Sequence, residues 1–131
     1  MTPPISVKGV LLQGSRVVLL ENERGEWELP GGRLEPGEKP EACVIREIAE
    51  ELGADVAVED ALEPWLYEVI PGRQVKILTY GVRRLDSGPL RISREHRRLG
   101  YFSIEELSDL PMPEGYRRSI RHWVAISRTA C

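Results

Sequence analysis

Residues 31–53 read GGRLEPGEKPEACVIREIAEELG, and no other part of the chain restricts its fold as strongly. The double glycine and the Pro-Gly pair predict a loop, and Pro40 suits the first turn of a helix. Gly53 predicts a left-handed stop at the end of that helix. One face of the helix has apolar residues at helical spacing, which predicts that this face packs on a core. Its members are Ile45, Ile48, Ala49 and Leu52.

The opposite face of the predicted helix carries three carboxylates. Glu47, Glu50 and Glu51 stand at i, i+3 and i+4, so their side chains point the same way and their heads are expected to be free. Like charges at this spacing cost an isolated helix roughly a few tenths of a kcal/mol per pair. A hard divalent cation would remove that cost, because Mg²⁺ binds carboxylate oxygens and substrate phosphates. A solvated helix face is the alternative explanation, since glutamate is a good helix former and is mostly exposed.

Other residues surround these glutamates at fixed offsets. From Gly32 a gap of five residues leads to Glu38, and a gap of seven leads to Arg46 and Glu47. The segment resembles Gly-x5-Glu-x7-Arg-Glu-aliphatic-x-Glu-Glu-x-Gly-aliphatic, the signature of the Nudix hydrolases. Only Ala54 departs from it, in place of a bulkier aliphatic residue, which affects local packing rather than chemistry. The matching residues are Gly32, Glu38, Arg46, Glu47, Ile48, Glu50, Glu51 and Gly53.

The resemblance implies an α/β fold, namely an α/β/α sandwich with a mixed sheet, in a single Nudix domain over residues 1–131. Periodicity alone predicts only the α/β class, with strands at residues 5–12, 16–21, 27–29, 55–58, 65–70, 75–82 and 99–102. Pro71 and Gly72 predict a turn. Ser103 and Glu106 form a capping box that predicts a short helix ending near Ser108. A final helix is expected over residues 115–127.

The composition fits a small globular enzyme rather than a disordered or membrane protein, with 41% hydrophobic and 30% charged residues. The apolar runs are too short to span a bilayer, and no secretion signal is visible, so we expect a cytoplasmic protein. Cys43 and Cys131 do not make a disulfide framework. Cys43 is most simply a small packing residue.

By the same resemblance, the chain would hydrolyse a nucleoside diphosphate linked to another moiety, with Mg²⁺ or Mn²⁺ as cofactor. The metal ligands would be Glu47, Glu50, Glu51 and the backbone carbonyl of Gly31. Such an ion would neutralise the anionic oxygens of the diphosphate and lower the pKa of bound water. Many ADP-sugar hydrolases of this family have an extra N-terminal region, which is not seen in this sequence. We therefore expect nucleoside triphosphates or small dinucleotides as substrates rather than ADP-sugars, without excluding ADP-ribose.

The resemblance also assigns supporting roles. Glu38 would pair with Arg46, and that pair would hold Glu47 in place. Glu47 is a candidate general base, but in some branches of the family a glutamate outside the motif does this work. Glu95 is a candidate for that outside residue, with an ordinary surface-loop glutamate as the alternative. His96 and His122 have no partner pattern and are expected at the surface.

Charge is unevenly spread along the chain. Residues 21–60 contain 13 acidic and 4 basic residues, whereas residues 73–98 contain 8 basic residues and only Asp86 and Glu95 as acids. An acidic part facing a basic part suits a small anionic phosphate ester, with scattered solvated arginines as the alternative. The basic run lacks interleaved aromatic residues, so duplex nucleic acid is not an expected partner. We also expect no membrane partner, because no apolar run is long enough to span a bilayer. The sequence does not specify the oligomeric state.

Aromatic side chains on the predicted strands belong either to the core or to a base-stacking platform. They are Trp27, Trp65, Tyr67, Tyr80, Tyr101 and Phe102.

Two rival functions are compatible with the fold. A catalytically silent nucleotide-binding regulatory module would be favoured by loss of a motif glutamate, and every one is present. An isomerase of isoprenoid diphosphates shares the fold but uses a cysteine on a separate loop. Neither Cys43, within the predicted helix, nor Cys131, at the terminus, suits that role.

Overall fold

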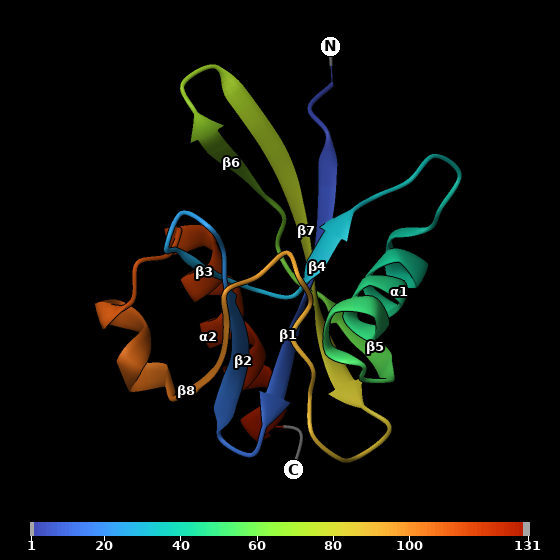
Figure 1. Cartoon of the computed structure of the whole chain (residues 1–131), viewed down its shortest axis with the longest axis vertical. Coiled ribbons are helices and arrows are strands. Elements are labelled where there is room, and N and C mark those ends of the chain that lie inside the picture. Colours follow the sequence, from blue (N-terminus) through green and yellow to red (C-terminus); the bar gives the residue numbers. More distant parts are fainter. Residues whose placement is uncertain (1, 130–131) are drawn as a thin grey trace.

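The computed structural model describes residues 2–129, in which the strands lie between one helix from the middle of the chain and a second helix near its C-terminus (Figure 1). The strands are β1 (Ile5–Gln13), β2 (Arg16–Glu21), β3 (Trp27–Glu28), β4 (Gly31–Arg33), β5 (Val56–Ala61), β6 (Trp65–Ile70), β7 (Arg73–Arg84) and β8 (Arg98–Phe102). The helices are α1 (Pro40–Leu52), the 3-10 helix η1 (Ile104–Asp109) and α2 (Glu114–Thr129). Within these residues, no helix has the length and apolar character needed to cross a bilayer.

Strand β1 organises a mixed sheet. It runs parallel to β7, with Ile5 opposite Lys76 and Leu11 opposite Val82, and antiparallel to β4 and β2. Strands β5 and β6 pair antiparallel with β7, whereas β3 and β8 flank β2. The expected mixed sheet is therefore confirmed.

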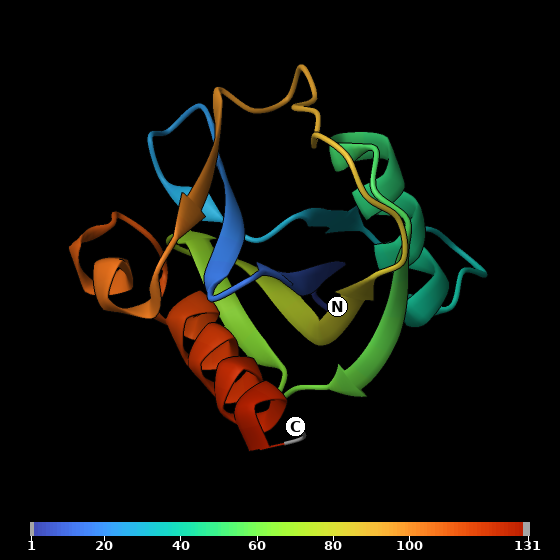
Figure 2. The same ribbon diagram turned by 90° about the horizontal axis from the view of Figure 1, so that it is seen from below.

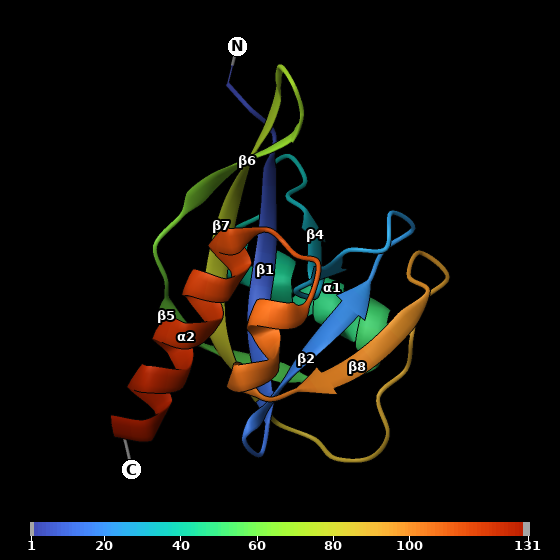
Figure 3. The same cartoon turned by 90° about the vertical axis from the view of Figure 1, so that its left-hand side faces the viewer.

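Successive side chains of the central strands point to opposite faces of the sheet, so they contribute to two separate cores. On β1, Val7 and Leu11 pack with α1, whereas Val10 packs with α2. On β2, Val18 and Leu20 join the first core, and their neighbours join the second. The two helices accordingly lie on opposite sides of the strands (Figures 2 and 3), which confirms the sandwich.

Helix α1 is rotated relative to the expected apolar face. Ile48 and Leu52 are fully buried as predicted, but Ala49 is exposed and Ile45 is only half-buried. The helix instead meets the sheet through Val44, Ile48 and Leu52, one turn apart, and buries Glu51 beside them. The prediction was wrong for Ala49 because the buried face begins earlier in the helix, at Cys43 and Val44, and this turns Ala49 toward solvent. Cys43 is a buried packing residue, as expected.

Most boundaries agree with the sequence, and the differences have local causes. The Gly31–Gly32 segment was expected as a loop, yet it pairs with Val7 and Lys8 as strand β4. Strand β5 continues to Ala61 through a bulge, which apolar alternation does not reveal. The Pro71-Gly72 turn is present, and the Glu106 carboxylate accepts a 2.8 Å hydrogen bond from the Ser103 N–H, which confirms the capping box. Cys131 lies outside the described residues.

Gly53 ends α1 in the left-handed conformation that its position predicts. Its φ is 69° and its ψ 23°, and its N–H donates to Ala49 O at 3.0 Å. We expect Gly53→Ala to lower the free energy of unfolding by about 1 kcal/mol, the cost of a side chain in this region. Gly53→Asn should lose less, because asparagine tolerates this conformation. Urea denaturation would measure both, and equal stability of Gly53→Ala and the natural chain would contradict the assignment.

Candidate active site

The junction of β4 with α1 brings the glycine pair against the acidic helix. The Gly31 N–H donates a 2.7 Å hydrogen bond to Glu51 Oε1. Gly31 has a φ of 147°, and a Cβ there would overlap the Val7 carbonyl. A Cβ on Gly32 would overlap the Glu47 carboxylate. Gly31 is therefore required because a side chain would collide with the backbone of β1, and Gly32 because β4 lies directly against the Glu47 carboxylate.

The three glutamates of α1 differ in exposure, so the expectation of three free heads was wrong. The Glu50 side chain is 59% exposed, that of Glu47 16%, and that of Glu51 only 5%. Because strand β4 lies so close to α1, the three carboxylates cannot be equally exposed to solvent. Burial raises the pKa of Glu51 to about 7, against the opposing effects of the Lys8 charge and the Gly31 hydrogen bond.

Arg46 forms the contacts that the family resemblance implies. Its Nε and Nη2 donate to the two oxygens of Glu38 at 2.7 and 3.0 Å, a two-point contact. Its Nη1 also lies 3.0 Å from Glu47 Oε1 and 3.4 Å from Glu50 Oε1. Hydrogen bonds from Arg46 hold the pKa of Glu38 at about 2. Arg46 thus partly offsets the repulsion between the carboxylates of the acidic face, even without a metal ion.

A hollow of about 480 Å³ opens over the acidic face. Glu95 lines it together with the α1 carboxylates, although more than forty residues separate them in sequence. Burial raises the pKa of Glu47, the Arg46 contact opposes that change, and the charges of Glu50 and Glu95 add to it. The full lining consists of Gly31, Gly32, Arg33, Glu47, Glu50, Glu51, Ser93, Arg94 and Glu95.

Behind this hollow lies a buried charged cluster that the sequence did not predict. Lys8 and Glu28 approach to 3.7 Å, and His96 Nε2 lies 3.0 Å from Glu28 Oε2. The expectation that His96 is a surface residue was wrong, because its side chain is only 5% exposed. Burial alone would raise the pKa of Glu28, but the His96 hydrogen bond and the Lys8 charge outweigh it and hold the pKa at about 2. Burial alone would lower the pKa of Lys8. Tyr116 and the nearby carboxylates outweigh that effect, so the pKa is raised overall and the ammonium stays charged.

One signal in the sequence points to this cluster. Lys8 is the one charged residue of β1 and lies in its buried stretch, where an ionisable side chain requires a partner. The identity of that partner depends on the pairing of β1 with its neighbours. Sequence spacing does not provide this pairing.

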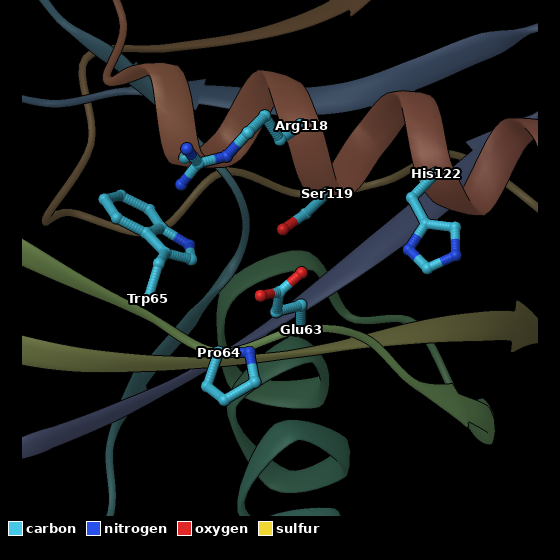
Figure 4. A pocket seen from close by; sticks show the side chains of 7 residues that line it. Glu63, Pro64, Trp65, Arg118, Ser119 and His122 are labelled. Carbon is cyan, nitrogen blue, oxygen red and sulfur yellow. The ribbon is translucent and has the colours of Figure 1, made fainter.

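A second hollow, of about 230 Å³, lies between α2 and the segment that precedes β6 (Figure 4). The Ser119 side chain points toward Glu63 across it, and the Arg118 side chain extends toward Trp65 at one end. His122 is exposed on its rim, as expected for a surface histidine. This hollow contains a single carboxylate, so it lacks the donor set of the first.

Several arginines of the basic segment are paired. Arg83 contacts Glu59, Arg84 contacts Asp86, and Arg98 binds both oxygens of Glu21. Arg94, by contrast, reaches the acidic hollow. The strand aromatics belong mainly to the core, where Trp27 is 6% exposed and packs edge-on against Phe102.

The residues of the acidic hollow fit a hard divalent cation. No three acidic, histidine or cysteine side chains among the described residues form a preassembled metal cluster. The donors are nevertheless carboxylate oxygens, the type that Mg²⁺ and Mn²⁺ prefer. Gly32 leaves open the space beside Glu47 that a Cβ would fill, and exposed Glu50 has only long contacts with Arg46.

Comparison with known proteins gives the same picture. The sequence model of the NUDIX domain matches residues 2–123. The Mycobacterium tuberculosis H37Rv protein named "Putative 8-oxo-dGTP diphosphatase 2" is 33% identical over 138 residues, which cover 98% of this chain and 92% of that protein.

Solved structures also share the fold. A MutT Nudix hydrolase from Burkholderia pseudomallei has a TM-score of 0.77 at 28% identity, over 92% of this chain and 98% of that one. A UDP-X diphosphatase has a TM-score of 0.80 at 24% identity, over all of this chain and 66% of that one.

A mixed sheet between two helices, with the motif glutamates gathered at one hollow, defines a hydrolase of the Nudix type. Together with the family match, this shows that the chain belongs to the Nudix pyrophosphohydrolase family and is an enzyme.

Contact between Gly32 and Glu47 allows a direct test of the site. In Gly32→Ala the added methyl group would displace the Glu47 carboxylate, and turnover should fall by roughly 100-fold, as for an angstrom-scale misplacement. The melting temperature should change little, because the carboxylate can turn toward solvent. Turnover and thermal unfolding of the variant would be measured together. Unchanged turnover would show that the position of Glu47 does not matter.

Proposed function

We propose that the chain is a divalent-metal-dependent pyrophosphohydrolase that cleaves a nucleoside diphosphate linked to another moiety. The observation that carries this proposal is the convergence of Glu47, Glu50, Glu51 and Glu95 with the Gly31–Gly32 backbone around one hollow. Four carboxylates on one small surface repel an anionic substrate unless cations intervene. Arg94 and Arg33 line the same hollow, and their guanidinium groups would bind phosphate oxygens.

Each residue then has a separate part in the reaction. The ion would be held by Glu47, Glu50, Glu51 and the Gly31 carbonyl. When bound, a divalent cation neutralises charge on the diphosphate and acidifies water. Arg46, fixed at two points by Glu38, orients Glu47.

Two glutamates are candidates for the general base. Glu47 has a raised pKa caused chiefly by burial, which favours proton acceptance, but it also contacts Arg46. Glu95 reaches the hollow from the segment before β8, and its carboxylate makes no hydrogen bond or ion pair with other described residues. In either case the base removes a proton from the water that attacks phosphorus, and the P–O bond to the leaving phosphate group breaks.

Nucleoside triphosphates are the substrate class that we propose first. The mycobacterial relative, which aligns over nearly the whole chain, carries the name of a diphosphatase acting on an oxidised purine nucleoside triphosphate. The hollow of about 480 Å³ is within the size range of small-molecule sites.

A product-release screen tests this function. Purified protein would be incubated with nucleoside triphosphates, including 8-oxo-dGTP, and with ADP-sugars and diadenosine polyphosphates. Each reaction would be run with Mg²⁺, with Mn²⁺ and with EDTA, and phosphate and pyrophosphate would be quantified. We expect metal-dependent release of pyrophosphate from a nucleoside triphosphate. Absence of turnover across the whole panel would contradict the proposal and favour a nucleotide-sensing module.

A further inference from the structure

His96 occupies a position between two carboxylates. Its Nε2 lies 3.0 Å from Glu28 Oε2, and its Nδ1 lies 3.6 Å from Glu51 Oε2. Glu51 is buried at the acidic hollow, whereas Glu28 belongs to β3, on the other side of the ring. The ring thus joins the hollow to the sheet.

Glu28 is a rigid anchor for this ring. Its Oε1 accepts a 2.8 Å hydrogen bond from Asn22 Nδ2, and its Oε2 lies 3.7 Å from Lys8 Nζ. Because the ionised carboxylate only accepts hydrogen bonds, His96 Nε2 must carry the hydrogen. In the neutral ring Nδ1 is then an acceptor, and the Ser93 hydroxyl lies 3.4 Å from it.

The chain segment that carries Glu95 depends on the same histidine. The backbone is fixed before it by Arg91 N–H to Leu52 O, at 2.8 Å, and after it by Arg97 N–H to Glu21 O, also at 2.8 Å. Figure 2 shows this segment, in yellow to orange, passing α1 before it enters β8. Between the two anchors, the side chains of Arg94 and Glu95 make no hydrogen bond or ion pair within residues 2–129. His96 is the residue of this segment whose side chain is inserted into the protein.

We propose that His96 is a positioning residue: held by Glu28, it fixes the Ser93–Glu95 segment over the acidic hollow, and its ring, 3.6 Å from Glu51 Oε2, keeps that carboxylate from turning away from Gly31. The catalytic part of this role rests on the proposed function. His96 takes no part in bond breaking, and its effect reaches the substrate through Glu51 and Glu95. Partners of metal ligands typically act in this way, by orienting groups that would otherwise rotate.

Limited digestion with trypsin tests the anchor without nucleotide or metal. Cleavage after Arg94, followed by mass spectrometry, reports opening of the segment. We expect His96→Ala to be cut there about tenfold faster or more, since a hydrogen bond to a charged group is lost. His96→Gln should restore most of the protection, because its amide can donate to Glu28. His122→Ala is the matched control, because it removes an exposed histidine from α2. It should be cut at the rate of the natural chain.

Binding of Mn²⁺, measured by electron paramagnetic resonance, tests the effect on Glu51. We expect His96→Ala to weaken Mn²⁺ affinity about 10- to 100-fold, the usual effect of removing a partner of a metal ligand. Turnover should fall mainly through kcat rather than KM. His96→Gln should recover part of both losses, because its amide can keep the bond to Glu28 that holds the side chain beside Glu51.

The outcomes separate this proposal from the proposed function. Trypsin cleavage of His96→Ala at the rate of the natural chain would overturn the positioning role, whatever the enzyme hydrolyses. Unchanged Mn²⁺ affinity in that variant would overturn it as well. A natural chain that hydrolyses no nucleotide, yet shows the expected cleavage pattern, would refute the proposed function and keep the anchor. Melting temperatures of all variants would identify any that fail to fold, and His96→Gln would then decide.

Discussion

Glu51→Gln is expected to lose most turnover while the fold stays intact. The substitution keeps the size of the side chain, and the amide oxygen can still accept the hydrogen bond from the Gly31 N–H. It removes the negative charge that would bind a cation. A loss of about 3 kcal/mol of transition-state stabilisation corresponds to roughly 100-fold in rate. Turnover at saturating Mg²⁺ would measure it.

Thermal stability of the metal-free variant should hold or rise slightly. The Glu51 side chain is 5% exposed, and burial raises its pKa to about 7, so the charged form is disfavoured in the folded protein. Its removal also relieves repulsion from Glu47. Lost attraction to Lys8 works in the opposite direction, which limits the gain.

A matched control lies on the same helix. Glu41 is an exposed glutamate of the first turn of α1 and accepts a hydrogen bond from the Tyr80 hydroxyl, which glutamine can also accept. Glu41→Gln should keep both turnover and stability. If Glu51→Gln turned over substrate like Glu41→Gln at saturating Mg²⁺, Glu51 could not be a metal ligand.

The sequence predicts the part of the site that depends on local geometry. Helical spacing brings Glu47, Glu50 and Glu51 to one side of α1 before any tertiary contact forms. The contact between Arg46 and Glu38 was implied by the family resemblance, and only residues 34–39 join β4 to α1. Local patterns of this kind need no knowledge of strand pairing.

Contacts that depend on strand pairing could not be predicted. Lys8, Glu28 and His96 come from β1, β3 and the segment before β8, which meet only after the sheet has formed. Burial of Glu51 has the same origin, since it requires β4 to pair with β1 and to place the Gly31 N–H beside the helix. An exposed histidine and a buried one look alike in sequence, and His122 and His96 illustrate both cases.

Arg46→Lys is expected to lower kcat roughly 10- to 100-fold and to weaken metal binding less. The guanidinium binds both oxygens of Glu38 while Nη1 reaches Glu47 Oε1 at 3.0 Å. Lysine carries the same charge but offers no planar fork, so it cannot make both contacts at once. The charge of the site is thus kept while the orientation of Glu47 is lost. The kcat and the Mn²⁺ affinity would be measured on the same preparation.

A double-mutant cycle separates orientation from charge. Arg46→Ala and Glu38→Ala each break the same two-point contact, so the double variant should lose little more turnover than the worse single variant. Glu35 offers a control partner, because it approaches Arg46 Nη2 only to 3.8 Å and is largely exposed. Arg46→Ala and Glu35→Ala should therefore have additive effects. If the losses for Arg46 and Glu38 also multiplied independently, the two residues would act separately, and Arg46 would affect Glu47 by charge alone.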